Sequence, residues 1–223
     1  MSTIKTNQLA HTANGASVYT LPQTDGSAGQ VLTTNGSGVL SWTDDQKGKI
    51  LQVANSTLNT RSNLSITNQY NNNSSNIYYV TGIDTTITTT QANSKLVISG
   101  SISGEFSNRD DLFGFILSST IGGTTAPIDT LRAASAGNRP RYTAQPSISF
   151  NGNDNDSTPL TTQFSNYWYA PSQVSGTAIT IRLGIACHPS SSQTFYINRC
   201  LGTTDNSDFE RLISHMTVME IAP

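Results

Sequence analysis

Side chains able to do acid–base, nucleophilic or metal chemistry are few and widely spaced in this 223-residue chain. The three histidines are His11, His188 and His215, and none stands in an H-x-H or H-E-x-x-H pattern that would bring two ligands to one metal ion. No spacing nominates a Ser–His–Asp triad either. We therefore predict no catalytic residue, no metal site and no cofactor, and a protein that is not an enzyme.

Acidic residues gather in two stretches rich in Asp and Asn, around Asp110–Asp111 and around Asp154–Asp156. Such loops can bind calcium through carboxylate and carbonyl oxygens, but neither stretch matches the D-x-[DN]-x-[DN]-G-x5-E loop. A carboxyl pair such as Glu105 and Asp110 could serve glycoside cleavage. We favour solvated loops, because the chain lacks the length and repeats of a depolymerising β-helix, and keep a glycan-cleaving enzyme as a minor alternative.

Exposed rings and arginines are the candidates for binding a surface ligand. The segment "FSNYWYAP" contains Tyr167, Trp168 and Tyr169, whose flat rings with a polar edge suit sugar stacking or protein contact. Alternation within a strand would turn at least one of these rings to the core. The segment "SAGNRPRYTAQ" carries Arg139 and Arg141, which could meet acidic surface glycans or lie in a solvated loop. These five are the predicted binding residues.

The elements that must position these side chains read as β-strands. From Lys49 onward apolar and polar residues alternate, which is the period of a half-buried strand. In "GTAITIRLGIAC" the alternation places Ile179, Ile181, Leu183 and Ile185 on one face. About eight to ten such segments, bounded by turn residues and without an amphipathic helix, indicate an all-β sandwich or barrel. The last of them, "LISHMTVMEIAP", predicts a C-terminal strand within the sheet.

One predicted strand is apolar on both faces. "DLFGFIL" places Phe113 and Phe115 on one side and Ile116 on the other. A strand of this kind lies either in the centre of a fold or at a subunit contact. The second interpretation makes Phe113 and Phe115 candidate oligomer-contact residues.

Composition excludes several classes of function. Charged residues make up 12% of the chain and the net charge is -2, so there is no basic stripe for nucleic acid. No apolar run approaches the roughly 20 residues of a spanning helix, and no secretory signal is visible. We expect a protein assembled in a cytoplasm, without membrane insertion. For Cys187 and Cys200 we favour two buried thiols over a disulfide.

The N-terminal part is patterned differently. Two copies of T-x-N-G-x-x-V, "TANGASV" and "TTNGSGV", predict a pair of short β-turn units, because Asn-Gly is a strong hairpin signal. The charged "TDDQKGKI" marks a boundary. We assign residues 1–45 to an extended attachment or oligomerisation segment and residues 46–223 to a β-sandwich head. The apolar residues expected to make the attachment contacts are Leu21, Val31, Leu32, Val39, Leu40 and Trp42.

The stretch "LPQTDGSAGQVLTTNGSGVLSW" resembles the N-terminal motif of tail-fibre and virion appendage proteins of tailed phages, especially marine phages. "TGIDTTITTTQANSKLVISGSISG" and "SHMTVMEIAP" are similar to the C-terminal domain of such fibre proteins, whereas residues 104–212 match little. The resemblance implies a jelly-roll-like head of the tumour-necrosis-factor and C1q type, and a homotrimer.

The same resemblance implies a function. It predicts a structural component of a bacteriophage virion, a tail fibre or appendage that mediates attachment to the host cell surface. Its partners would be two further copies of the chain, other virion proteins through the N-terminal segment, and a glycan or protein of the host surface. The alternative within this class is a capsid-bound fibre or decoration protein.

Overall fold

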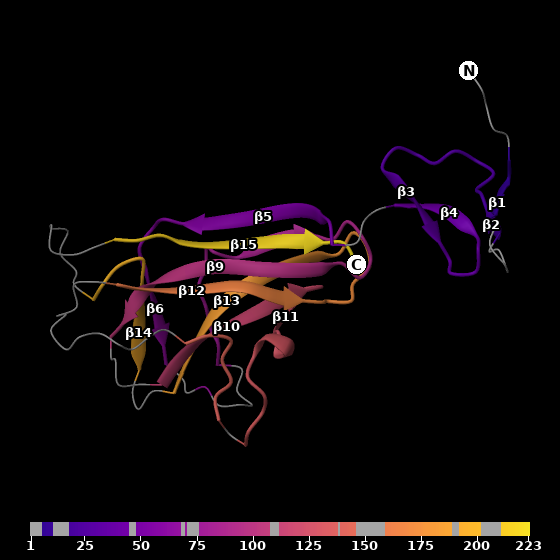
Figure 1. Ribbon diagram of the computed structural model, residues 1–223. Coiled ribbons are helices and arrows are strands. Elements are labelled where there is room, and N and C mark those ends of the chain that lie inside the picture. Colours follow the sequence, from indigo (N-terminus) through magenta and orange to yellow (C-terminus); the bar gives the residue numbers. More distant parts are fainter. Residues whose placement is uncertain are drawn as a thin grey trace. The chain divides into compact units, whose positions relative to one another are not determined.

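The computed structural model describes residues 6–10, 18–44, 48–67, 70, 76–107, 112–137, 139–145, 159–188, 192–201 and 211–223. Its contacts divide the chain into two compact units, Met1–Lys49 and Ile50–Pro223 (Figure 1). The division lies four residues beyond the boundary assigned after residue 45.

The first unit contains two small antiparallel pairs of strands. β1 (Gln8–Ala10) pairs with β2 (Val18–Thr20), and β3 (Gln30–Thr34) pairs with β4 (Leu40–Asp44). Asn35 shapes the turn between β3 and β4, because its Oδ1 accepts hydrogen bonds from the backbone N–H groups of Ser37 (2.8 Å) and Val39 (3.2 Å). The second Asn-Gly copy therefore forms a hairpin as predicted, while residues 12–17 of the first copy lie outside the described residues.

Backbone hydrogen bonds and one ring hold this unit together. The N–H of Thr20 donates to the carbonyl of Gly38 at 2.8 Å, which joins β2 to the β3–β4 hairpin. Trp42 donates from Nε1 to the carbonyl of Thr24 at 3.0 Å. Its ring covers Gly26, where an added Cβ would lie 2.6 Å from the ring, so only glycine fits there. The unit thus folds with little buried apolar surface.

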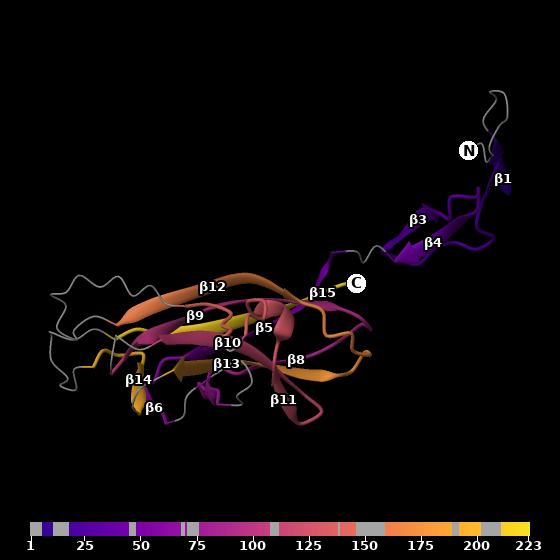
Figure 2. The ribbon, with the colours of Figure 1, turned by 90° about the horizontal axis from the view of Figure 1, so that it is seen from below.

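The second unit is a sandwich of two antiparallel sheets (Figures 1 and 2). In the first sheet four strands are neighbours in the order β5 (Ile50–Leu58), β15 (Ser214–Ile221), β9 (Lys95–Phe106) and β12 (Leu160–Tyr169). The edge of β9 that pairs with β15 also pairs, nearer its C-terminal end, with β14 (Gln193–Ile197). β14 in turn pairs with β6 (Ser62–Ile66). In the second sheet the order is β11 (Thr124–Pro127), β10 (Leu112–Ile121) and β13 (Ala178–His188), with β7 (Tyr78–Tyr79) and β8 (Thr85–Thr88) both on the far edge of β13.

The order of the strands is that of a jelly roll. The chain passes between the two sheets from β8 to β9, from β9 to β10, from β11 to β12 and again from β12 to β13, which is the double Greek-key connection of that architecture. The predicted all-β antiparallel sandwich is confirmed. Among the described residues the helical structure is one short 3-10 turn, Asp129–Leu131.

The core lies between the two sheets and follows the predicted alternation. Ile179, Ile181, Leu183 and Ile185 of β13 are all buried against the inward residues of β9. Each such side chain contributes about 1.5–3 kcal/mol through burial. A group of four phenylalanines fills one end of the core, Phe106, Phe113, Phe115 and Phe195.

The structure corrects the role assigned to Phe113 and Phe115. They are only 6% and 2% exposed and pack within the core of the same chain, so they are not surface residues for an oligomer contact. The opposite face of β10 is apolar because the chain itself covers it: Ile116 packs with Tyr70 and Tyr142. Alternation shows that a face is shielded from water, but it does not show which segment shields it.

Both cysteines behave as expected. Cys187 lies in the core on β13, and Cys200 is buried just after β14. Both are buried thiols, as predicted.

Candidate functional site

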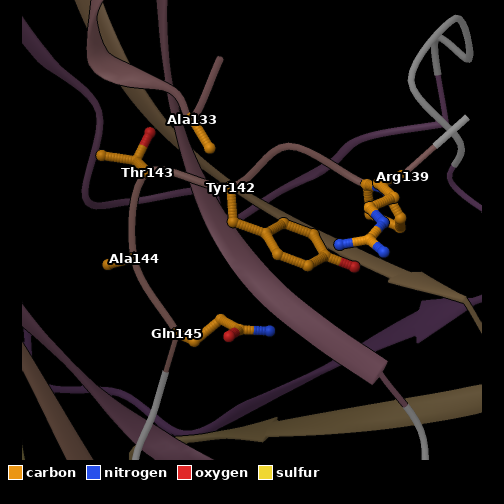
Figure 3. Close-up of a pocket in the computed structure, with 7 residues that line it drawn as sticks. Ala133, Arg139, Tyr142, Thr143, Ala144 and Gln145 are labelled. Atoms are coloured by element: carbon orange, nitrogen blue, oxygen red, sulfur yellow. The ribbon is translucent and has the colours of Figure 1, made fainter. Parts of the chain in front are cut away.

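A cavity of about 640 Å³ lies beside β10 in the head (Figure 3). Residues 139–145, here called the covering segment, supply most of its wall. The segment is held against β10 because Phe115 donates its N–H to the carbonyl of Ala144 at 2.7 Å, and Thr143 donates its N–H to the carbonyl of Phe115 at 2.8 Å. The lining residues are Ala133, Arg139, Pro140, Tyr142, Thr143, Ala144 and Gln145.

Tyr142 is the central side chain of this cavity. Its ring covers Gly114, where a Cβ would lie 2.3 Å from the ring, and it stacks on Tyr70 with the ring centroids 5.9 Å apart. Its hydroxyl oxygen is buried and has no hydrogen-bond partner among the described residues. Burial, with smaller contributions from Cys187 and Tyr70, raises the pKa of the phenol. Tyr142 therefore keeps its proton and presents an unused O–H donor.

The structure separates the two predicted arginines. Arg139 is exposed and lines the cavity, and among the described residues its guanidinium makes no hydrogen bond or ion pair. Arg141 instead donates from Nε to the carbonyl of Ala133 at 2.5 Å and lies 3.5 Å from the carboxylate of Asp129. Arg139 is thus available to a ligand, whereas Arg141 holds the covering segment in place.

The three predicted aromatic residues also have different roles. Tyr167 and Tyr169 pack against the core, and their hydroxyls bond to the carbonyl of Thr143 (3.1 Å) and the hydroxyl of Ser119 (3.1 Å). The expectation that at least one ring faces the core is therefore confirmed. Trp168 points the other way and is 56% exposed. Of the three rings, it is the one most accessible to a partner.

Trp168 is one end of an apolar row across the outer face of the first sheet. Trp168 on β12 is paired with Val97 on β9, Val97 with Met219 on β15, and Met219 with Val53 on β5. Val53, at the other end, is 58% exposed. The rows on its side toward Leu58 of β5 are polar, as in the row of Thr57, His215, Ser101 and Gln163. We refer to the four residues from Val53 to Trp168 as the apolar row.

The predicted attachment residues lie in the first unit, largely on its surface. Val31, Leu32, Val39 and Trp42 are exposed by 38–46%, whereas Leu21 and Leu40 are half-buried. Sequence reasoning missed three further exposed residues, Leu9, Val18 and Tyr19. Because Val18 and Tyr19 belong to a strand of only three residues, alternation gave too short a signal to find them.

The ionisable residues considered for chemistry are engaged in the fold or lie outside the described residues. His215 shares a 3.0 Å hydrogen bond with the hydroxyl of Ser101, and the carboxylate of Glu105 accepts the N–H of Leu201 at 2.6 Å. His11, the side chain of His188, Asp110–Asp111 and Asp154–Asp156 are not described. Within the part of the chain that is described, no group of three His, Cys, Asp or Glu side chains could hold a metal ion.

Comparisons with known proteins add little to this picture. No protein-family model and no curated protein matches the chain. Two solved structures, of infectious bursal disease virus strains Gt and Gx, align with 82% of this chain at 15% and 14% identity, with TM-scores of 0.31 and 0.28. The chain spans 40% and 39% of the length of those chains. Among the described residues, no helix is long and apolar enough to cross a membrane.

Proposed function

We propose that this chain is a structural appendage protein of a bacteriophage virion, attached through Met1–Lys49 and presenting its jelly-roll head to the host cell surface. The observation that carries the proposal is the contrast between the two units. The head buries a complete core of its own, whereas the first unit leaves Val31, Leu32 and Trp42 exposed in a segment of fewer than fifty residues.

An exposed apolar surface of this kind favours a partner. A large contiguous apolar patch on the surface of a folded protein commonly marks a site of contact with a partner. Leu32 and Trp42 are directly opposite each other on β3 and β4. They lie within the stretch that resembles the attachment motif of tail-fibre proteins. We therefore assign this unit to contacts with other virion proteins.

The apolar row supports a second part of the proposal, that the head forms a homotrimer. Its ends, Val53 and Trp168, lie on the two outer strands of the first sheet and are both more than half exposed. Copies of the chain packed through this face would bury the row. The resemblance to trimeric heads favours three copies.

The proposed role in the virion is adhesion. A trimer presents three copies of each exposed site, and several linked sites raise the effective concentration without new contacts. The site of the head that best suits a host ligand is the cavity beside β10 with the covering segment that lines it, since loops carry specificity on a constant scaffold.

Electron microscopy of intact particles tests this function. Gold-labelled antibody against the head should decorate the virions of the virus that encodes the chain. Decoration of the tail supports the tail-fibre assignment, and decoration of the capsid supports a capsid fibre or decoration protein. Virions that contain no trace of the chain, by labelling and by mass spectrometry, would overturn the proposal.

A further inference from the structure

The unused donors of the cavity point to a ligand. A buried polar group without a hydrogen bond destabilises a fold, so most buried polar groups in folded proteins are paired. Among the described residues the Tyr142 hydroxyl is an exception: it is buried without a hydrogen bond, on a side chain that lines the cavity. Arg139 lines the same cavity, and its guanidinium makes no hydrogen bond or ion pair within the described part of the chain. Figure 3 shows the Arg139 guanidinium directed toward the hydroxyl end of the Tyr142 ring.

The side chains that line the cavity indicate which class of ligand it would bind. A guanidinium binds a carboxylate with paired N–H donors, which makes Arg139 the anchor for an acidic group. Gln145 donates its amide N–H to the carbonyl of Phe113 at 3.3 Å, and its carbonyl oxygen remains to accept a ligand hydroxyl. Ala133, Pro140 and Ala144 supply apolar walls. A cavity near 640 Å³ is in the size range of small-molecule sites.

We propose that this cavity binds a carboxylate-bearing sugar residue of a surface polysaccharide, with Arg139 on the carboxylate and the Tyr142 hydroxyl and Gln145 on neighbouring oxygens. The inference deepens the proposed adhesion function and rests on it for its biological setting. A carboxylated sugar fits better than a simple anion, because the wall offers both donors and an acceptor among apolar side chains. Arg139 is exposed and unpaired among the described residues, so it can move aside as the ligand enters.

Calorimetric titration of the full-length chain tests the inference. The probes are short oligosaccharides containing glucuronate, galacturonate or sialic acid, each paired with its carboxyl-reduced form. At least one acidic sugar should bind ten or more times tighter than its reduced counterpart. Arg139→Gln should weaken that binding by about 10- to 100-fold, the usual effect of losing a charged hydrogen bond. Lys95→Gln, which removes an equal charge from an exposed site at the end of β9, should leave it unchanged.

A pair of tyrosine variants separates binding from folding. Tyr142→Phe should weaken acidic-sugar binding roughly fivefold without lowering the melting temperature, since its hydroxyl has no partner to lose. Tyr79→Phe should lower the melting temperature and leave acidic-sugar binding unchanged, because the Tyr79 hydroxyl donates a hydrogen bond to the Ser118 hydroxyl within the fold at 3.2 Å. The inference is overturned if no acidic sugar binds better than its reduced form, or if Arg139→Gln and Tyr142→Phe both bind like the parent chain.

Failure of the proposed sugar site and failure of the proposed virion role would give different experimental results. A chain that is found on virions but does not discriminate acidic from reduced sugars would contradict only the assignment of the cavity. A chain that binds acidic sugars through Arg139 but is absent from virions would contradict the virion role and leave the site standing.

Discussion

Glu220 is a buried carboxylate on β15 whose oxygens are fully used. It accepts hydrogen bonds from Gln52 Nε2 (2.6 Å), from the backbone N–H of Thr90 (2.8 Å), from the Thr90 hydroxyl (3.0 Å) and from the N–H of Gln91 (3.3 Å). Burial raises the pKa of Glu220, but the hydrogen bonds from Ser94, Gln52 and Thr90 outweigh it and lower the pKa below its usual value. This carboxylate fastens residues 90–94 to the first sheet.

The lowered pKa predicts acid sensitivity of the head. A carboxyl with a lower pKa in the folded state stabilises the fold fully above its unfolded pKa of about 4.3, and loses that contribution as the pH falls through the folded value. Glu220→Gln should therefore reduce the free energy of unfolding at pH 7 by about 2 kcal/mol. Its unfolding midpoint should also fall less steeply than that of the parent chain below pH about 4.3. Chemical denaturation across pH 3–7 measures both, and parallel pH profiles for the two proteins would contradict the assignment.

Gly114 is a second residue whose identity follows from a contact. Its missing side chain makes room for the Tyr142 ring, because a Cβ would lie 2.3 Å from that ring. Gly114→Ala should destabilise the head by about 1–3 kcal/mol, the range for overpacking a tight site. In a Tyr142→Ala background the same change should cost much less, and a double-mutant cycle measures the coupling. If the two substitutions change the free energy of unfolding additively, the packing of the Tyr142 ring does not depend on Gly114.

At this scale the sequence predicted residue types better than residue roles. It nominated Arg139 and Arg141 from one polar segment, but only contacts distinguish the exposed Arg139 from Arg141, which is tied to Ala133 and Asp129. It did not nominate Tyr142. What distinguishes Tyr142 is that its ring packs over Gly114, twenty-eight positions earlier in the chain. A contact between residues so far apart in the sequence cannot be predicted from a local sequence pattern.

Among the elements, the strands with regular alternation were predictable. β9, β13 and β15 follow the expected inward and outward positions because one face of each meets the core. β10 follows the same rule, but its face with Phe113 and Phe115 was the candidate for a contact with another subunit, whereas that face packs in the core of the same chain. Residues of the same chain also cover the opposite face, which carries Ile116. The residues that cover the Ile116 face, Tyr70 and Tyr142, lie in irregular segments, and such segments have no alternating sequence pattern that would reveal the contact.

The outer face of the first sheet yields a prediction about assembly. Val53→Glu places a charge at the exposed end of the apolar row and should convert the proposed trimer to a folded monomer, because burying an unpaired charge at a contact is costly. Thr57→Glu is the matched control, on the same strand and face but in a polar row. Light scattering with circular dichroism reports both size and folding. A parent chain that is a stable monomer at micromolar concentration would contradict the trimer.

On the scale of the whole molecule, the chain combines a self-sufficient head with a small unit that has little core. The described residues of Met1–Lys49 are held together by two pairs of strands and by the contact of Trp42 with Thr24 and Gly26, whereas the head has a core of its own between two sheets. The change in composition near residue 45 was visible in the sequence. The exposure of Leu9, Val18 and Tyr19 was not, since it depends on how the short strands pair.

The most direct test of this account is the incorporation of a head that lacks the first unit. A chain truncated to Ile50–Pro223 should unfold cooperatively, with a melting temperature within a few degrees of the full-length protein, because its core is complete without residues 1–49. Supplied in place of the full chain during virus assembly, it should be absent from purified virions. A truncated head that enters virions as efficiently as the full chain would contradict the assignment of Met1–Lys49 to attachment.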